Sequence, residues 1–329
     1  MRLSDFQYDL PSELIAQYPA QKRDECRLLV VDRTGKTIEH GIFRDIERIL
    51  RPEDLLVLND TKVLTCRLRG FRKTGGKVEI FILRRIKDLT FEVMLRPGRV
   101  KIGEKICLGA NGLTGTLTKQ DEFTFEADSI DAVYAAGEIP LPPYIKRPVE
   151  ASDAQYYQTV YAASPGSVAS PTAGLHFTPE LLRRLEKKGV DTAYLTLHVG
   201  TGTFKPVTCD DITEHVMDHE YFTIPLETLE AIERHKKENS RIIAVGTTSC
   251  RTLESFAAGR TQGQTDLFIY PGYEFKLVSG LLTNFHLPAT TLYMLVCAFA
   301  GMELARKAYS QAIEKKYRFY SYGDAMLVI

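Results

Sequence analysis

Three of the seven histidines lie between apolar neighbours, where an imidazole is shielded from water. They are His176, His198 and His286, in the tripeptides Leu-His-Phe, Leu-His-Val and Phe-His-Leu. A shielded imidazole can transfer protons, although a single histidine in this setting is more often a core residue bonded to the backbone. All three sit beside glycine-rich or turn-forming segments, so we expect at least one to line a ligand pocket. The other four have charged neighbours and are expected at the surface: His40, His215, His219 and His235.

Small residues follow two strand-like segments. Gly200 and Gly202 come after VDTAYLTLHV, and Gly246, Thr247 and Thr248 separate RIIAV from a helix. Open α/β sheets bind ligands beyond the carboxyl ends of their strands, and helix N-termini offer free N–H groups to anions. We therefore expect these turns to hold a carboxylate or ribose hydroxyls. The alternative is that they are ordinary turns.

Several familiar catalytic patterns are missing from the sequence. It contains no GxGxxG fingerprint, P-loop, serine elbow or paired cysteines, and its six cysteines are spread evenly, as expected of thiols in a reducing compartment. His215 and His219 stand beside acids but lack the HExxH order, so we expect no metal site. Asp324 follows a glycine among aromatic residues and is expected to be a partly buried carboxylate, with a surface turn as the alternative.

The chain has 329 residues, of which 44% are hydrophobic and 26% charged, and its formal net charge is zero. This size and composition favour a folded protein with two domains, or with one domain and a large insertion. The N-terminus has no apolar run typical of a signal peptide, and the most apolar window, LYMLVCAFAG, is roughly half as long as a membrane span. We expect a cytoplasmic protein without membrane contact.

The segments that must position these residues are of two kinds. Six short strand-like runs (RLRGF, GKVEIFILRR, LTFEVMLRP, EKICLG, LTGTLTKQ and EFTFEAD) favour a small antiparallel barrel, and the stretch IPLPPYIKRP favours an extended connector. Elsewhere helix-like and strand-like segments alternate. The pattern predicts an α/β main domain (a mixed sheet with flanking helices, not Rossmann) from residues 1–59 and 149–329. A six-stranded antiparallel β-barrel is inserted at residues 60–148.

Charge is divided unevenly between the segments. Residues 61–110 contain thirteen lysines and arginines against four acids, whereas residues 111–154 contain three against eight. A basic strand face can serve solubility or follow a nucleic-acid backbone, and charge alone does not separate the two.

Ten segments carry a resemblance that runs nearly end to end: LIAQYPAQKRDECRLLV, LLVLNDTKV, GGKVEIFIL, PLPPYIKR, YQTVYA, SPTAGLHFT, TLHVGTGTFKPV, AVGTTSCRTLES, TNFHLPATTLYMLVCAFAG and YRFYSYGDAMLVI. In this order they resemble the S-adenosylmethionine:tRNA ribosyltransferase-isomerases of queuosine biosynthesis. Three positions depart from the family pattern. Ser170 replaces a usual alanine, Ala289 replaces a frequent lysine, and Asp218 stands where the family tends to have histidine, so a role for a second histidine there is in doubt.

The resemblance implies an α/β domain with an inserted barrel and an unusual use of S-adenosylmethionine as a ribosyl donor. The acceptor is the amine of 7-aminomethyl-7-deazaguanine at the wobble position of a tRNA. The ribosyl unit is rearranged to an epoxycyclopentane, which gives epoxyqueuosine with release of adenine and methionine. S-adenosylmethionine is then a co-substrate, with no prosthetic group, and we expect a monomer. The sulfonium acidifies the neighbouring C5′ protons, so the site needs a base, and the departing adenine needs a proton donor.

The resemblance also suggests roles. His176 or His198 would be the base, with His286 as a third candidate, and Asp324 with Tyr322 would lie near the sulfonium or adenine. Gly246 to Thr248 and the helix start at Pro179 would hold the methionine carboxylate or the ribose. The expected polar rim is Arg23, Asp24, Arg27, Asn59, Asp60 and Thr61. Further substrate-binding candidates are Pro171, Thr172, Gly174, Gly200, Gly202 and Asn284. The expected tRNA contacts are Arg67, Arg69, Arg72, Lys73, Arg84 and Arg85.

Two other classes of protein remain open. A non-catalytic RNA-binding module would use the barrel and keep the α/β part as a scaffold, and an RNA methyltransferase would use the same co-substrate. The missing glycine-rich loop counts against the methyltransferase, and the three shielded histidines count against binding alone.

Overall fold

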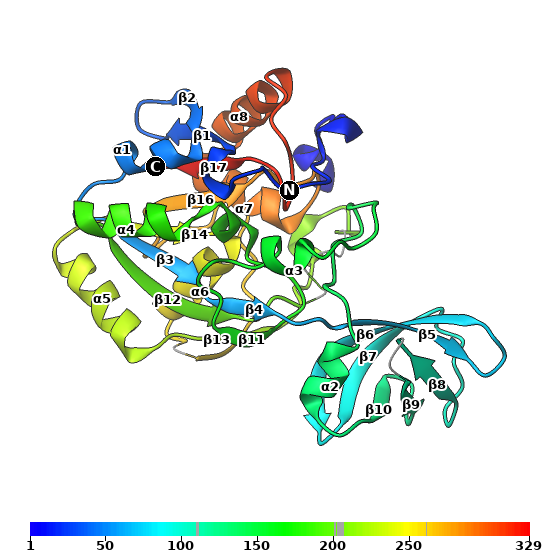
Figure 1. The fold of residues 1–329 in the computed structure, drawn as a ribbon. Coiled ribbons are helices and arrows are strands. Elements are labelled where there is room, and N and C mark those ends of the chain that lie inside the picture. Colours follow the sequence, from blue (N-terminus) through cyan, green and yellow to red (C-terminus); the bar gives the residue numbers. More distant parts are fainter. Residues whose placement is uncertain (110–111, 201, 203–206, 261) are drawn as a thin grey trace.

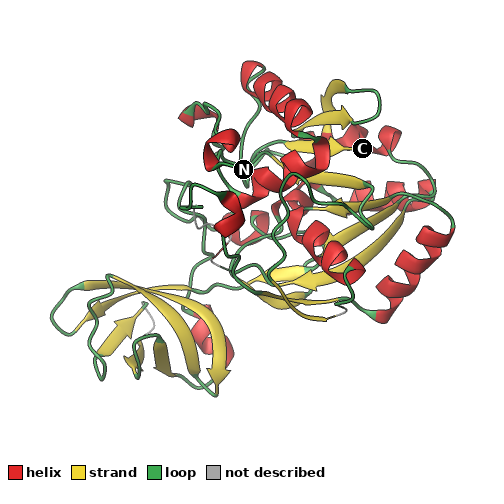
Figure 2. Cartoon of the chain, turned by 180° about the vertical axis from the view of Figure 1, so that it is seen from behind, coloured by secondary structure: helices red, strands yellow, loops and turns green. Residues whose placement is uncertain are grey.

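The computed structural model describes residues 1–109, 112–200, 202, 207–260 and 262–329. An α/β main domain is built on a nine-stranded mixed sheet, and a closed six-stranded barrel projects from one corner of it (Figures 1 and 2). The predicted fold class is therefore confirmed. Within the described part of the chain, no helix combines the length and the apolar character needed to cross a membrane.

The main sheet has the strand order β15-β13-β12-β3-β14-β16-β17-β1-β2. Its centre is parallel, because β3 pairs in parallel with β12 and β14, and β14 with β16. The carboxyl ends of these four strands therefore meet at one edge. The strands span Arg27–Asp32 (β1), Thr37–Ile42 (β2), Leu55–Asn59 (β3), Asp191–Leu197 (β12), Glu220–Thr223 (β13), Ile242–Val245 (β14), Gln262–Thr265 (β15), Gly280–Asn284 (β16) and Ala325–Val328 (β17).

Side chains that alternate along each strand feed two hydrophobic cores. In β3, Leu55 and Val57 join the core under α5 to α8, whereas Leu56 and Leu58 join the core under α1 and α4. Both faces of the sheet are thus covered by helices, as expected for a largely parallel sheet. The helices span Ile46–Ile49 (α1), Pro179–Lys188 (α4), Leu226–Lys237 (α5), Thr247–Ala257 (α6), Thr291–Ala300 (α7) and Met302–Glu314 (α8).

All six strand-like runs form strands of the barrel. Their inward residues alternate along the chain, as Val78, Ile80 and Ile82 do in β6, and they close a separate hydrophobic core. The strands span Arg67–Arg72 (β5), Lys77–Lys87 (β6), Thr90–Arg96 (β7), Lys105–Leu108 (β8), Leu113–Leu117 (β9) and Glu122–Glu126 (β10), and helix α2 (Ile130–Ala135) follows them.

Two segments join the barrel to the main domain. The outgoing strand β4 (Thr61–Val63) pairs in parallel with β11 (Ser164–Ser167). The returning proline-rich segment is extended, as predicted, and three of its residues (Ile139, Leu141 and Ile145) form a small core with Leu175 and Tyr322 of the main domain. This segment, which ends before α3 (Asp153–Tyr156), therefore packs on the main domain.

Candidate active site

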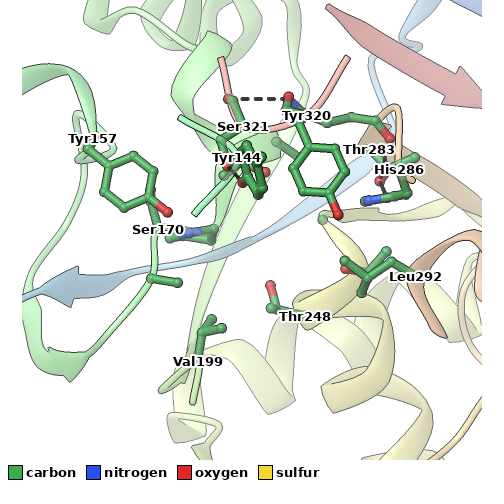
Figure 3. A pocket seen from close by; sticks show the side chains of 17 residues that line it. Tyr144, Tyr157, Ser170, Val199, Thr248, Thr283, His286, Leu292, Tyr320 and Ser321 are labelled. Carbon is green, nitrogen blue, oxygen red and sulfur yellow. Dashed lines mark hydrogen bonds between the residues drawn. The ribbon is translucent and has the colours of Figure 1, made fainter. Parts of the chain in front are cut away.

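A hollow of the main domain lies beyond the carboxyl ends of β12, β14 and β16, where strand topology favours a ligand site (Figure 3). It has about 620 Å³ of empty space, part of it open to solvent, which suits a small-molecule ligand. We call it the main hollow. It is lined by Tyr144, Tyr157, Ala169, Ser170, Pro171, Thr172, Ala173, Val199, Gly246, Thr247, Thr248, Thr283, Asn284, His286, Leu292, Tyr320 and Ser321.

The lining of the main hollow carries no aspartate, glutamate, lysine or arginine among the described residues. Three tyrosines give it aromatic walls. Burial raises the pKa of Tyr157 and of Tyr320, so both hydroxyls stay protonated and can donate hydrogen bonds. Tyr320 has a positive φ of 73°, a conformation that costs a non-glycine residue free energy and here carries its ring into the hollow (Figure 3).

His286 is the one predicted catalytic residue that lines the main hollow. Its Nε2 atom lies 2.7 Å from the Thr283 hydroxyl, and its Nδ1 atom has no hydrogen-bond partner among the described residues. Its backbone is held from two sides, because the Tyr8 hydroxyl donates to its carbonyl and its N–H donates to the Tyr309 hydroxyl at 3.1 Å. Burial lowers the pKa of His286 to about 3, so the ring is neutral at physiological pH.

His176 belongs to a second, smaller pocket of about 270 Å³ that shares Ser321 with the main hollow. Its Nε2 lies 3.3 Å from Asn284 Oδ1, and its Nδ1 lies 3.0 Å from Cys26 Sγ. The Asn284 amide nitrogen donates to the Tyr320 carbonyl, so the amide oxygen faces His176. It follows that Nε2 carries the proton and that Nδ1 accepts from the Cys26 thiol. His176 thus orients Asn284 and has no free lone pair to act as a base.

Acid should destabilise the fold through His176, because burial lowers its pKa to about 4. The unfolded chain takes up this proton near pH 6.5 and the folded chain does not, so stability is full above pH 6.5 and falls as pH drops toward 4. Between pH 7 and pH 4.5 the free energy of unfolding should fall in both proteins. Because glutamine cannot be protonated, we expect the fall to be about 2 kcal/mol smaller in His176→Gln than in the wild type. Urea unfolding at both pH values measures the difference. Equal losses in the two proteins would contradict a depressed pKa.

His198 lines neither pocket. Its Nδ1 atom lies 2.8 Å from the Thr61 hydroxyl, and its ring covers Gly166, where an added Cβ would approach ring atoms to 2.7 Å. The next residue, Val199, lines the main hollow, and successive residues of an extended chain point in opposite directions. Burial lowers the pKa of His198. The His198 side chain therefore links strands β4 and β11 to the end of β12.

Asp324 is buried and held by two arginines. It accepts hydrogen bonds from the backbone N–H groups of Arg27 at 3.0 Å and Arg318 at 2.8 Å, and both guanidinium groups approach it. It lines neither pocket, so the structure does not place it with His286. Arg23 and Tyr322 do line the smaller pocket, where Arg23 donates to the Leu175 and Gln155 carbonyls, and Asp24 is half-buried beside them.

The predicted polar rim is divided between two interior residues and four half-buried ones, Arg23, Asp24, Arg27 and Asp60. Asn59 and Thr61 are fully buried, and Asn59 bridges β3 and β12 through the N–H and carbonyl of Leu197. Asp60 accepts from the Thr196 hydroxyl at 2.6 Å. These three residues therefore do not form an exposed rim, because their side chains serve as hydrogen-bond links between strands.

Some of the predicted glycines and their neighbours line the main hollow, and others do not. Pro171, Thr172, Gly246, Thr247, Thr248 and Asn284 line the main hollow. In contrast, Gly174 packs so closely on the Tyr161 hydroxyl that an added Cβ would lie 2.0 Å from it, and Gly202 is equally close to Asp218. Gly200 donates its N–H to Glu220 at 3.2 Å. Residues 201 and 203–206 of this loop lie outside the described residues.

Most of the basic residues proposed for tRNA binding are paired within the barrel. Arg67, Arg69, Arg72 and Arg84 each face a glutamate (Glu79, Glu138, Glu104 and Glu92 in turn), and Arg85 donates to the Asp88 carbonyl. Lys73 is exposed and has no ion pair among the described residues. Four of the six predicted tRNA contacts therefore already have an acidic partner, so they offer less unpaired positive charge than their number suggests.

The remaining histidines are not gathered into a metal-binding group, and one of them is not at the surface. No group of three or more His, Cys, Asp or Glu side chains in the described part of the chain is placed to hold a metal ion. The expected exposure of His235 is wrong, because its ring is only 3% exposed and lies between the Glu53 carbonyl and the Asp191 carboxylate. Charged neighbours along a helix do not predict the direction in which a side chain points.

Several lining residues were not predicted as site residues, namely Tyr144, Tyr157, Ser170, Thr283, Tyr320 and Ser321. They come from the returning connector, from the segments that follow α3 and β11, from β16 and from the turn before β17. Tyr144 lies in the proline-rich stretch, and its hydroxyl contacts Ser321 far along the chain. An aromatic residue inside such a conspicuous connector was the one available signal, because no local pattern predicts that these segments meet.

Comparisons with known proteins agree along the full chain. The family described as queuosine biosynthesis protein matches residues 3–328. A protein named S-adenosylmethionine:tRNA ribosyltransferase-isomerase from Sulfurihydrogenibium sp. (strain YO3AOP1) is 53% identical over 336 residues, with all of both chains covered. One of the same name from Thermosipho africanus is 51% identical with the same coverage. The crystal structure of S-adenosylmethionine tRNA ribosyltransferase from Thermotoga maritima is 38% identical, has a TM-score of 0.59, and is matched over 99% of this chain and 100% of that one. The chain belongs to the queuosine biosynthesis protein family.

Proposed function

We propose that this protein is an S-adenosylmethionine:tRNA ribosyltransferase-isomerase. It transfers the ribosyl part of S-adenosylmethionine to the aminomethyl group of 7-aminomethyl-7-deazaguanine at the wobble position of a tRNA. Isomerisation of the transferred unit gives epoxyqueuosine-tRNA, and adenine and methionine are released. The full-length match to relatives that carry this name supports the reaction.

The observation that carries the site assignment is the character of the main hollow. It is lined by aromatic and hydroxyl groups with no formal charge among its described residues, and His286 is neutral there. A sulfonium cation is stabilised by aromatic faces, which Tyr144, Tyr157 and Tyr320 supply. The hollow therefore suits S-adenosylmethionine, which is a co-substrate that is consumed.

The reaction needs a group that takes the C5′ proton beside the sulfonium, and His286 fits this role best. Its ring is unprotonated and lies in the wall of the hollow, whereas the lone pair of His176 is engaged by Cys26 and His198 lines neither pocket. The departing adenine needs a donor. Tyr157 and Tyr320 supply protonated hydroxyls in the same hollow.

A product assay tests the reaction. The protein is incubated with S-adenosylmethionine and tRNA that carries the aminomethyl-deazaguanine precursor, and the small-molecule products are identified. We expect free adenine and methionine in equal amounts. S-adenosylhomocysteine would indicate a methyltransferase, and no product would indicate a binding module.

The exposed face of the barrel is proposed to bind tRNA phosphates, with Lys73 as a main contact. Lys73→Ala should lower the slope of log K against log salt concentration by about one unit, because one fewer counterion is released. Arg72→Ala, at the preceding residue where β5 ends, is the matched control, since Glu104 already neutralises Arg72 through hydrogen bonds of 2.7 and 2.9 Å. Filter binding between 50 and 300 mM salt, roughly the range where the effect is large, measures both slopes. Equal slopes in wild type and Lys73→Ala would remove Lys73 from the tRNA contacts.

We further expect that the enzyme needs no prosthetic group, works as a monomer and acts in the cytoplasm, where precursor tRNA is found. Activity of protein purified in the presence of a chelator, and the mass in solution, check the first two expectations.

A further inference from the structure

The first turn of α6 faces the main hollow and has no side-chain cap. The helix begins at Thr247 and spans 11 residues, and its N-cap position is Gly246, which offers no side-chain oxygen to the free N–H groups. By contrast, the N-terminus of α4 is capped by the Thr178 hydroxyl. Gly246 and the first two residues of α6 line the hollow. N–H groups at the positive end of the helix dipole, without partners among the described residues, therefore border the ligand space.

Two buried hydroxyls that line the main hollow have no hydrogen-bond partner among the described residues. Ser170 Oγ and Thr248 Oγ1 are inaccessible to solvent and make no hydrogen bond to the described residues. Ser170 is only 6% exposed, and the Thr248 hydroxyl projects into the hollow (Figure 3). Buried hydroxyl groups without partners are rare in native proteins, and they call for a ligand or water that is absent from the protein alone.

The charge of the lining limits the ligand group that can occupy this wall. The lining offers donors of two kinds, hydroxyls and helix N–H groups, and none of the described lining residues has a carboxylate that could accept from them. The same lining has no lysine or arginine to balance a doubly charged phosphate. A carboxylate, with one delocalised charge and two acceptor oxygens, matches a helix N-terminus flanked by hydroxyl donors.

We infer that the N-terminus of α6, together with Ser170 and Thr248, is the subsite for the carboxylate of the methionine part of S-adenosylmethionine. This inference rests on the proposed function. One carboxylate oxygen accepts from the free N–H groups of α6, and the hydroxyls of Thr248 and Ser170 donate to the carboxylate from the side. The subsite thereby sets the direction of the ligand in the hollow, with the amino-acid end at β14 and α6.

Binding of two ligands to three proteins tests the subsite. S-adenosylmethionine and its decarboxylated analogue, which lacks only this carboxylate, are measured by equilibrium dialysis against wild type, Thr248→Val and Ser170→Ala. Unmodified tRNA of the same sequence is present throughout, because it occupies the RNA site and cannot react. We expect Thr248→Val to weaken binding of S-adenosylmethionine about tenfold or more, since it removes a hydrogen bond to a charged group. Ser170→Ala should weaken binding of S-adenosylmethionine by a smaller factor, because the family usually has alanine at this position. The analogue should bind wild type at least about tenfold more weakly, and it should bind both variants as it binds wild type.

The matched control is Thr159→Val. The Thr159 hydroxyl is also buried without a partner but does not line the main hollow, so this variant should bind S-adenosylmethionine as wild type does. All three variants should unfold at the wild-type urea concentration or above it, because no intramolecular hydrogen bond is lost.

Two results would overturn the subsite: equal binding of both ligands by wild type, or substitutions that weaken both ligands by the same factor. In either case adenine and methionine release by wild type would still support the proposed function. Failure of wild type to bind S-adenosylmethionine or to release these products would overturn both.

Discussion

Replacement of His286 by alanine should lower the single-turnover rate of adenine release by about 10²-fold, the lower end of what a positioned base contributes, because a ring with a pKa of about 3 is a weak base. His286 is the one histidine that lines the main hollow, and its neutral ring leaves Nδ1 without a partner among the described residues. Rapid quench with saturating S-adenosylmethionine and precursor tRNA measures the rate. The equilibrium binding of both substrates should change far less than the rate does.

The same experiment on His198 supplies the control. His198→Ala should retain a rate within about tenfold of wild type, because the His198 ring lines neither pocket and is hydrogen-bonded to the Thr61 hydroxyl. A wild-type rate for His286→Ala would remove His286 from the mechanism. A rate for His198→Ala as low as that expected for His286→Ala would restore His198 as the base.

The pH dependence sharpens the assignment of His286. With a pKa of about 3, the ring stays unprotonated from pH 8 down to pH 5, so it should cause no loss of single-turnover rate in this range. An acidic limb near pH 6.5 that disappears in His286→Gln would contradict the burial of this ring.

Asp153→Asn should destabilise the protein by about 3–5 kcal/mol, the usual cost of leaving one partner of a buried ion pair alone. Asp153 is 1% exposed and accepts two hydrogen bonds of 2.7 Å from Arg147, one from the Glu150 N–H and one from the Tyr322 hydroxyl. Burial alone would raise the pKa of Asp153, but these hydrogen bonds outweigh it and the pKa is lowered. Since Arg147 lies in the returning connector, the substitution should also loosen the attachment of that connector to the main domain.

Urea denaturation monitored by circular dichroism at pH 7 measures this loss. Glu180→Gln is the control, because it removes an exposed pair, with Glu180 70% and Arg183 65% exposed, and should change stability by less than about 0.5 kcal/mol. A loss for Asp153→Asn as small as that of the control would show that the buried pair does not hold the connector. Because the pKa of Asp153 is lowered in the folded protein, the stabilisation by its ion pair is present above about pH 4 and is lost at lower pH.

Local patterns in the sequence determined the elements of the fold and several residues that line the main hollow. Alternating apolar residues marked all six barrel strands, and the run RIIAV followed by Gly246-Thr247-Thr248 marked a buried strand that ends in a helix start. Such patterns are readable because side-chain period and turn chemistry depend on neighbouring residues alone. They also placed Pro171, Thr172, Asn284 and His286 among the candidates for the pocket that they line.

Only the tertiary structure decided among residues with the same local pattern. His176, His198 and His286 share apolar neighbours in the sequence, yet their hydrogen-bond partners differ. His176 bonds to Cys26, His198 bonds to Thr61 of β4, and His286 bonds to Thr283 in the wall of the main hollow. Three arginines of the barrel likewise form ion pairs with glutamates that are distant in the sequence or lie on the next strand. Burial, pKa and free charge depend on partners that are distant in the chain, and strand order and the return of the connector decide which partners meet.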